Sequence, residues 1–131
     1  MISSQIRDSL KSPQCIFNYV VNHLRFQGKK SERFKYKNTK YCYYRGDNGT
    51  SCAIGCLISD EEYKPEIEEL SINKIYFIFN DLKTIEWFHS NENLLFSLQR
   101  VHDHYPIENW EWEFHLISIK FGIQVQPPFY I

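Results

Sequence analysis

The sequence predicts an α+β fold, namely a mainly helical single domain with one β-hairpin packed on the helices. Apolar residues recur at three- and four-residue steps in several segments, as on the buried face of a helix. Asp47-Asn48-Gly49 separates a tyrosine-rich run from an apolar run and has the composition of a tight hairpin turn. The 131 residues suffice for one domain with its own core, and a lone hairpin needs a helical layer against it.

The chain is expected to divide into an N-terminal arm, a globular domain and an extended C-terminal tail, over residues 1–11, 12–123 and 124–131. Ser12 and Pro13 have the residue types of an N-cap and a first helical position. Gly28 has that of a C-terminal stop. The first helix is therefore predicted over Pro13–Gln27.

Two helical signals follow the hairpin. Ser59 and Glu62 have capping-box spacing, which predicts the start of a short helix that Pro65 limits. The apolar spacing over 72–82 favours another helix, although β-branched and aromatic residues within it also suit a strand.

Two further helices are predicted near the C-terminus. Residues 87–89 are expected in a linker, after which Asn91 caps a helix over 92–104. The last helix is predicted over 109–121, because Gly122 is a C-terminal stop.

The segment Cys52-Ala-Ile-Gly-Cys-Leu-Ile58 consists almost wholly of small or branched apolar residues, so we expect it to be buried and closely packed. The chain lacks an apolar signal region and an apolar run of membrane-spanning length, which favours the cytoplasm and no membrane partner. In that reducing compartment, the four cysteines are expected as buried thiols or metal ligands rather than disulfides.

The formal net charge of −1 makes nucleic acid an unlikely partner, because such proteins carry a positive field. Between Lys29 and Arg45, however, basic residues interleave with aromatic ones. Such a mixture suits a small anionic ligand such as a nucleotide. It also suits the solvated edge of a hairpin. The candidate ligand-binding residues are Arg45, Lys35, Lys37, Tyr36, Tyr43 and Asn48.

An acidic block over 60–69 follows the basic one. The two blocks are expected to face each other within the monomer or between subunits, so a homo-oligomer stays open. A structural alternative for Arg45 is pairing with this acidic block.

Three kinds of chemical site are alternatives to a purely structural role of these residues. Zinc ligation by Cys42, Cys52 and Cys56 is disfavoured, since the spacings differ from those of paired zinc ligands. A cysteine nucleophile lacks an adjacent activating group, and a phosphate cradle at residues 45–49 contains an acid. The candidate bases for a cysteine enzyme are His102, His104 and His115. Because residues two apart on a helix point in different directions, at most one of His102 and His104 faces the core. We expect no catalytic residue, metal or cofactor.

The run from Cys42 to Ile58, Cys-Tyr-Tyr-Arg-Gly-Asp-Asn-Gly-Thr-Ser-Cys-Ala-Ile-Gly-Cys-Leu-Ile, resembles a family of small uncharacterised phage and prophage proteins. Similarity continues in the acidic turn with Tyr63 and Pro65 and in the later run 94–103. The lysine-rich approach to Cys42 departs from the family pattern. No activity or catalytic residue is carried over. The resemblance implies a bacterial host, where small phage proteins often bind and block a host component.

The sequence thus favours a non-enzymatic, phage-encoded accessory binding protein. It would inhibit or modulate a host defence component by binding a protein or by sequestering a small anionic nucleotide signal. The alternative is a small enzyme that depends on a cysteine or a metal.

Overall fold

The computed structural model describes residues 2–36 and 39–127, which form a mainly helical α+β domain with one antiparallel hairpin, as predicted. The helices and strands of the described residues are α1 (Ser4–Ser9), α2 (Pro13–Gln27), β1 (Glu32–Tyr36), β2 (Thr39–Cys42), α3 (Ile72–Ile75), α4 (Leu82–Ser90), α5 (Glu92–His104) and α6 (Trp110–Phe121). Short 3₁₀ turns occupy Asp47–Gly49, Gly55–Leu57, Pro65–Glu69, Tyr76–Ile78 and Ile107–Asn109. Among these elements, no helix combines the length and apolar character that a membrane span requires.

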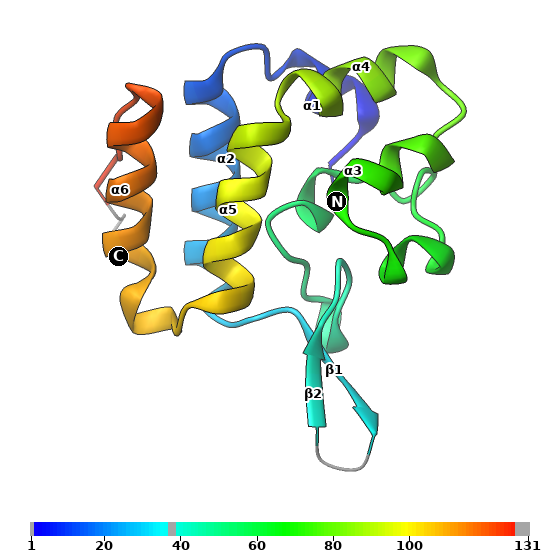
Figure 1. Ribbon diagram of the computed structural model, residues 1–131, viewed down its shortest axis with the longest axis horizontal. Coiled ribbons are helices and arrows are strands. Elements are labelled where there is room, and N and C mark those ends of the chain that lie inside the picture. Colours follow the sequence, from blue (N-terminus) through cyan, green and yellow to red (C-terminus); the bar gives the residue numbers. More distant parts are fainter. Residues whose placement is uncertain (1, 37–38, 128–131) are drawn as a thin grey trace.

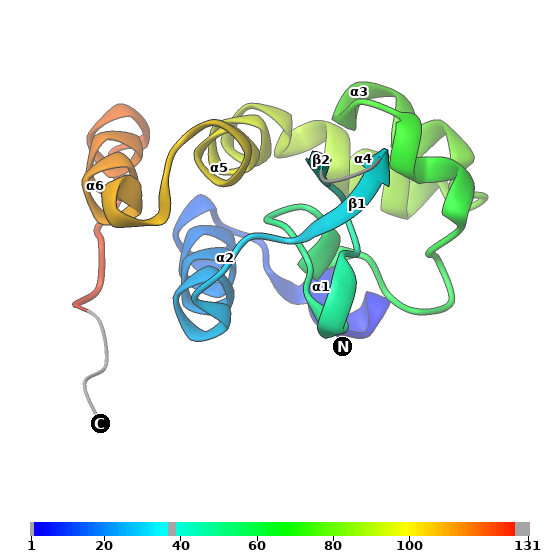
Figure 2. The same ribbon diagram turned by 90° about the horizontal axis from the view of Figure 1, so that it is seen from below.

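The helices form two groups with the hairpin between them. Helices α2, α5 and α6 lie together at one end of the molecule, whereas α1, α3 and α4 gather at the other (Figure 1). Figure 2 shows α2, α5 and α6 almost end on. The ring of Phe17 on α2 packs against that of Phe114 on α6 at a centroid distance of 6.4 Å. The hairpin projects from the junction of the two groups, so its base adjoins α5 (Figure 1).

Helix α2 has the bounds that its capping signals predict. The Ser12 side chain accepts a hydrogen bond from the Cys15 N–H, and Pro13 fills the first turn. Gly28 ends the helix with a φ of 66°, which favours glycine. The buried face consists of Ile16, Phe17, Val20, Val21 and Leu24.

The predicted position of the hairpin is wrong. The paired strands are β1 and β2, which lie before the expected turn. Asp47–Gly49 does form a tight turn, in which Asn48 has a φ of 59°, and one isolated bridge between Arg45 and Ser51 closes it. Pairing stops there because the chain next folds into buried helical turns, with Cys56 N–H donating to the Cys52 carbonyl.

The apolar segment Cys52–Ile58 is buried, as predicted. Cys52, Ile54 and Leu57 are 0 % exposed. Gly55 lies against the backbone of Tyr44, where a Cβ atom would overlap the carbonyl oxygen. This segment therefore forms the close contact between the core and the end of the hairpin.

Two predicted boundaries are wrong. Glu62 reaches back to the Ser59 N–H at 3.0 Å, but a turn rather than a helix follows, because Lys64, the residue before Pro65, is extended. The linker expected over residues 87–89 belongs to α4, in which Thr84 and Phe88 are both buried one turn apart. The predicted helices over 72–82, 92–104 and 109–121 correspond to α3 with the 3₁₀ turn after it, α5 and α6.

Both ends of the described chain pack on the domain. Residues 1–11, expected as a polar arm or a weak helical turn, contain α1, whose Arg7 is 0 % exposed and hydrogen-bonds Glu62 at 2.5 Å. The tail is extended at its described start, where the Gln14 side chain donates to the Gln124 carbonyl at 2.8 Å and accepts from its N–H.

Candidate functional site

Arg45, the main expected ligand contact, is engaged within the chain. Its Nη1 lies 2.9 Å from an Asp60 carboxylate oxygen, and its Nη2 donates to the Ile58 carbonyl at 3.2 Å. The guanidinium also lies 4.3 Å from the centroid of the Tyr63 ring. These contacts are the ones that the structural alternative expects for Arg45.

The other expected ligand contacts do not share one site with Arg45. Tyr43 lines a cleft beside α5, whereas Asn48 lines a separate hollow of about 520 Å³. Three lysines border that second hollow, namely Lys29, Lys30 and Lys40. Lys35 and Tyr36 belong to β1, of which only the backbone is described at these positions, and Lys37 lies outside the described residues.

The basic and acidic blocks pair within the monomer. Glu68, whose side chain is 6 % exposed, accepts hydrogen bonds from the N–H groups of Tyr44 and Arg45 at 2.7 and 3.1 Å. The Tyr63 hydroxyl donates to the same carboxylate at 2.6 Å, and Arg33 lies 3.6 Å from it. Together with the Arg45–Asp60 pair, these contacts pair the two arginines of the basic block with acidic side chains.

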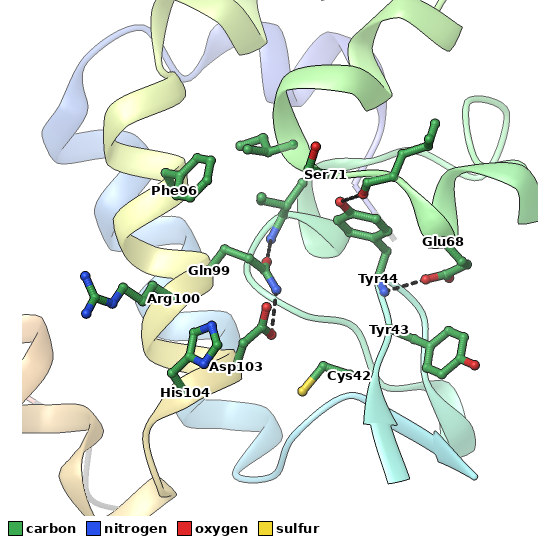
Figure 3. A pocket seen from close by; sticks show the side chains of 13 residues that line it. Cys42, Tyr43, Tyr44, Glu68, Ser71, Phe96, Gln99, Arg100, Asp103 and His104 are labelled. Atoms are coloured by element: carbon green, nitrogen blue, oxygen red, sulfur yellow. Dashed lines mark hydrogen bonds between the residues drawn. The ribbon is translucent and has the colours of Figure 1, made fainter. Parts of the chain in front are cut away.

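A cleft of about 350 Å³ lies between α5 and the start of the segment after the hairpin (Figure 3). Residues on one face of α5 form one wall: Phe96, Gln99, Arg100, Asp103 and His104. The facing wall includes Cys42, Tyr43, Tyr44, Leu70 and Ser71. Figure 3 shows Gln99 and Asp103 directed toward this facing wall, whereas Arg100 extends away from it.

Asp103 is held at the cleft wall by several donors. Its carboxylate accepts hydrogen bonds from His102 Nδ1 and from the Gln99 amide, each at 2.8 Å. Gln99 in turn accepts the Ile54 N–H at 3.0 Å. His102 Nε2 accepts the Ser31 N–H at 2.9 Å, so Nδ1 carries the ring proton and the imidazole is neutral.

The Asp103 side chain therefore presents a negative charge to the cleft. Burial alone would raise its pKa, but the hydrogen bonds from His102 and Gln99 outweigh burial, and the pKa lies below the usual value. The side chain keeps 30 % of its surface exposed. Hydrogen bonds from His102, Gln99 and Cys42 therefore stabilise this carboxylate at the cleft wall.

The thiols near the cleft are protonated at neutral pH. Burial, followed by the nearby Asp103 carboxylate, raises the pKa of Cys42 to about 12. Burial raises the pKa of Cys52 to about 12 and raises that of Cys56 well above its usual value. A protonated thiol is a poor nucleophile and a poor metal ligand.

Cys42, His102 and Asp103 form the cluster closest to a metal site, with candidate ligand atoms within 4.8 Å of one another. The donor set does not fit a metal ion. One imidazole nitrogen accepts a backbone N–H and the other donates to Asp103, while the thiol also hydrogen-bonds that carboxylate. A metal ion bound at either imidazole nitrogen would displace the hydrogen bond made there, and ligation by Cys42 would require its thiol to lose a proton.

The histidines do not activate either buried thiol. His102 is 0 % exposed and His104 is exposed, which confirms that at most one of them faces the core. His115 is exposed on α6. Cys52 and Cys56 lie inside the core with raised pKa values, so none of these histidines acts as a base for a reactive cysteine.

Sequence reasoning missed the α5 wall of the cleft. Phe96, Gln99 and Asp103 recur at three- and four-residue steps within the predicted helix over 92–104. That spacing places them on one flank beside the buried leucines. The signal was present in the sequence, but the residues that face them across the cleft come from the misplaced hairpin.

Comparisons with protein-family models, with curated proteins and with solved structures each find no match to this chain. Its function is therefore inferred from the cleft and the residues around it.

Proposed function

We propose that this chain is a non-enzymatic binding protein whose cleft beside α5 receives a cationic side chain of a protein partner. The carrying observation is the Asp103 carboxylate, which hydrogen bonds hold in the ionised form at the cleft wall. A lysine or arginine side chain that enters the cleft supplies the missing positive charge. The thiols and the imidazole around it take structural roles.

Aromatic rings complement this charge. Phe96 is 52 % exposed at the mouth of the cleft, and Tyr43 belongs to its facing wall. Ring faces attract cations, and the apolar stem of an arginine or lysine packs against such rings. A carboxylate near the exposed Phe96 ring is thus a suitable anchor for one basic residue at the centre of a protein interface.

The same charges disfavour a nucleotide in this cleft. Asp103 and Glu68 both belong to its lining, whereas Arg100 lines it but extends away from the facing wall (Figure 3). Arg45 is already paired with Asp60. A phosphate would face these carboxylates, and like charges in proximity are costly. Of the two partner classes expected from the sequence, the protein partner is the one that we propose.

The resemblance to phage and prophage proteins supplies the biological part of the proposal. The protein would act in the cytoplasm of an infected bacterium, where it binds and modulates a host defence protein. A basic residue on that host protein would occupy the cleft. The surface of the host protein around that residue would then be blocked.

The experiment compares proteins captured from bacterial lysate by four immobilised forms: wild type, Asp103→Asn, Phe96→Ala and Glu61→Gln. Asn keeps the shape and a hydrogen-bond acceptor but removes the charge, and Glu61 is an exposed acid that does not line the cleft. We expect a captured protein that is lost with the two cleft variants and retained with the Glu61 control.

Mass spectrometry of small molecules released by denaturing the purified wild type completes the test. Release of a stoichiometric nucleotide, or capture that is independent of Asp103 and Phe96, would contradict the proposal.

A further inference from the structure

Helix α6 is apolar on two opposite faces. Its inner face buries Trp110, Phe114 and Ile117 against the domain. Its outer face carries Trp112, Leu116 and Ile119, which are 62 %, 41 % and 66 % exposed. Steps of four and three residues align these three side chains in one stripe. We call Trp112, Leu116 and Ile119 the α6 stripe.

Such a helix differs from a surface helix with one side in water. An amphipathic surface helix has a polar outer face, and a helix that is apolar all round is normally covered. Helix α6 lies at the edge of the α2–α5–α6 group (Figures 1 and 2), so the described part of its own chain leaves the α6 stripe open. A contiguous exposed stripe of this kind is typical of an interaction surface.

We propose that a second copy of this chain covers the α6 stripe, with the two α6 helices antiparallel across a twofold axis near Leu116. In this arrangement Trp112 of one copy approaches the C-terminal half of the partner helix, where Ile119 lies. Each stripe thus covers the other, as in an isologous dimer.

Charge on one flank of α6 supports this occupant. Glu113 and Lys120 are seven residues apart, so they lie two turns apart on the same flank. Both line a hollow of about 180 Å³ between α5 and α6, so this flank of α6 faces α5.

A twofold axis between antiparallel helices brings equal flanks together. The midpoint between Glu113 and Lys120 falls beside Leu116, which is also the middle of the α6 stripe. Glu113 of each copy therefore meets Lys120 of the other, and the dimer gains two opposite-charge pairs. A parallel twofold arrangement would instead bring opposite flanks together, so Glu113 would not meet Lys120, and the charge pattern fits the antiparallel arrangement.

The shared hollow gives the partner helix room. Its α5 side includes Val101 and Tyr105, and its α6 side includes Leu116 and Ile117. Side chains of the second copy can enter it, as ridges of one helix enter grooves of another. The α6 stripe contributes no residue to the Asp103 cleft, and the cleft and the hollow share only Arg100.

Sedimentation equilibrium of the full chain tests the proposal, with single charge reversals and their combination. We expect wild type to dimerise reversibly, and Glu113→Lys and Lys120→Glu each to weaken the dimer about tenfold or more, because each places like charges together. The double variant restores opposite charges and should regain most of the wild-type affinity. Lys74→Glu, at an exposed position on α3, is the charge-matched control.

Each other outcome overturns the proposal. A wild type that stays monomeric up to its solubility limit means that another occupant, or none, covers the stripe. A dimer indifferent to the single reversals uses another surface. A dimer that the double variant does not restore is not held by the antiparallel charge pairs, provided that circular dichroism shows every variant to be folded.

Discussion

Replacing Gly55 with alanine tests the close packing between the apolar segment 52–58 and the hairpin. The added Cβ would overlap the Tyr44 carbonyl oxygen and lie 2.8 Å from its carbonyl carbon, closer than folded proteins allow. That carbonyl accepts the buried Cys52 N–H at 3.2 Å, while Glu68 holds the Tyr44 N–H. The backbone of Tyr44 therefore has little freedom to move away.

Two contributions set the magnitude. Overpacking a tight core costs about 1–3 kcal/mol, and straining or losing the hydrogen bond of a buried N–H costs about another 1–3 kcal/mol. We expect Gly55→Ala to lower the free energy of unfolding by about 2–6 kcal/mol, measured by urea denaturation followed by circular dichroism.

Gly49→Ala is the matched control for this glycine. Gly49 has a φ of 72° but no atom near the position of a new Cβ, so only backbone strain of about 1 kcal/mol is expected. A loss for Gly55→Ala no larger than that for Gly49→Ala would refute the proposed collision.

The remaining predictions concern charged side chains and thiols. Arg7→Met should lower stability by about 3–5 kcal/mol in urea denaturation, because it leaves Glu62 without its cation, and an unchanged midpoint would contradict a buried pair. Despite burial, hydrogen bonds from Arg7 and Ser59 lower the pKa of Glu62. The contribution of the ionised Glu62 carboxylate to the free energy of unfolding is therefore complete above its unfolded-state pKa of about 4.3 and is lost as pH falls further. Acid unfolding should show this loss in wild type and not in Glu62→Gln. In thiol labelling at pH 8, exposed Cys15 should react and Cys52 should react only on unfolding; rapid native labelling of Cys52 would contradict its burial. Arg45→Ala should lower the melting temperature without changing any ligand titration of the folded protein, whereas a weakened titration would return Arg45 to the binding site.

Local signals in the sequence predicted much of the helical structure. Ser12, Pro13 and Gly28 define both ends of α2, because capping hydrogen bonds and left-handed φ angles depend on adjacent residues. Gly122 similarly ends α6 with a φ of 65°. The apolar composition of 52–58 correctly predicted burial, since such a segment has no stable exposed form.

Long-range contacts explain what the sequence did not predict. Turn chemistry at Asn48 and Gly49 fixes a positive φ but not which strands pair, and the core segment that follows prevents pairing there. Arg7 lies in a polar stretch, yet its side chain is buried and hydrogen-bonds Glu62 and the Leu57 carbonyl, which are distant in sequence. The cleft was missed for the same reason, because its walls meet only through tertiary packing.

An NMR titration of isotope-labelled protein with arginine amide and citrulline amide, both N-acetylated so that only the side chain can carry charge, tests the cation-binding cleft most directly. The two probes differ in the charge of the side-chain head group, while their stems are alike. We predict that arginine amide perturbs the signals of Phe96, Gln99 and Asp103 in wild type, and that citrulline amide or the Asp103→Asn variant loses this effect. Equal perturbation by both probes, or perturbation of the same signals by adenosine monophosphate instead, would contradict a cleft built for a cation.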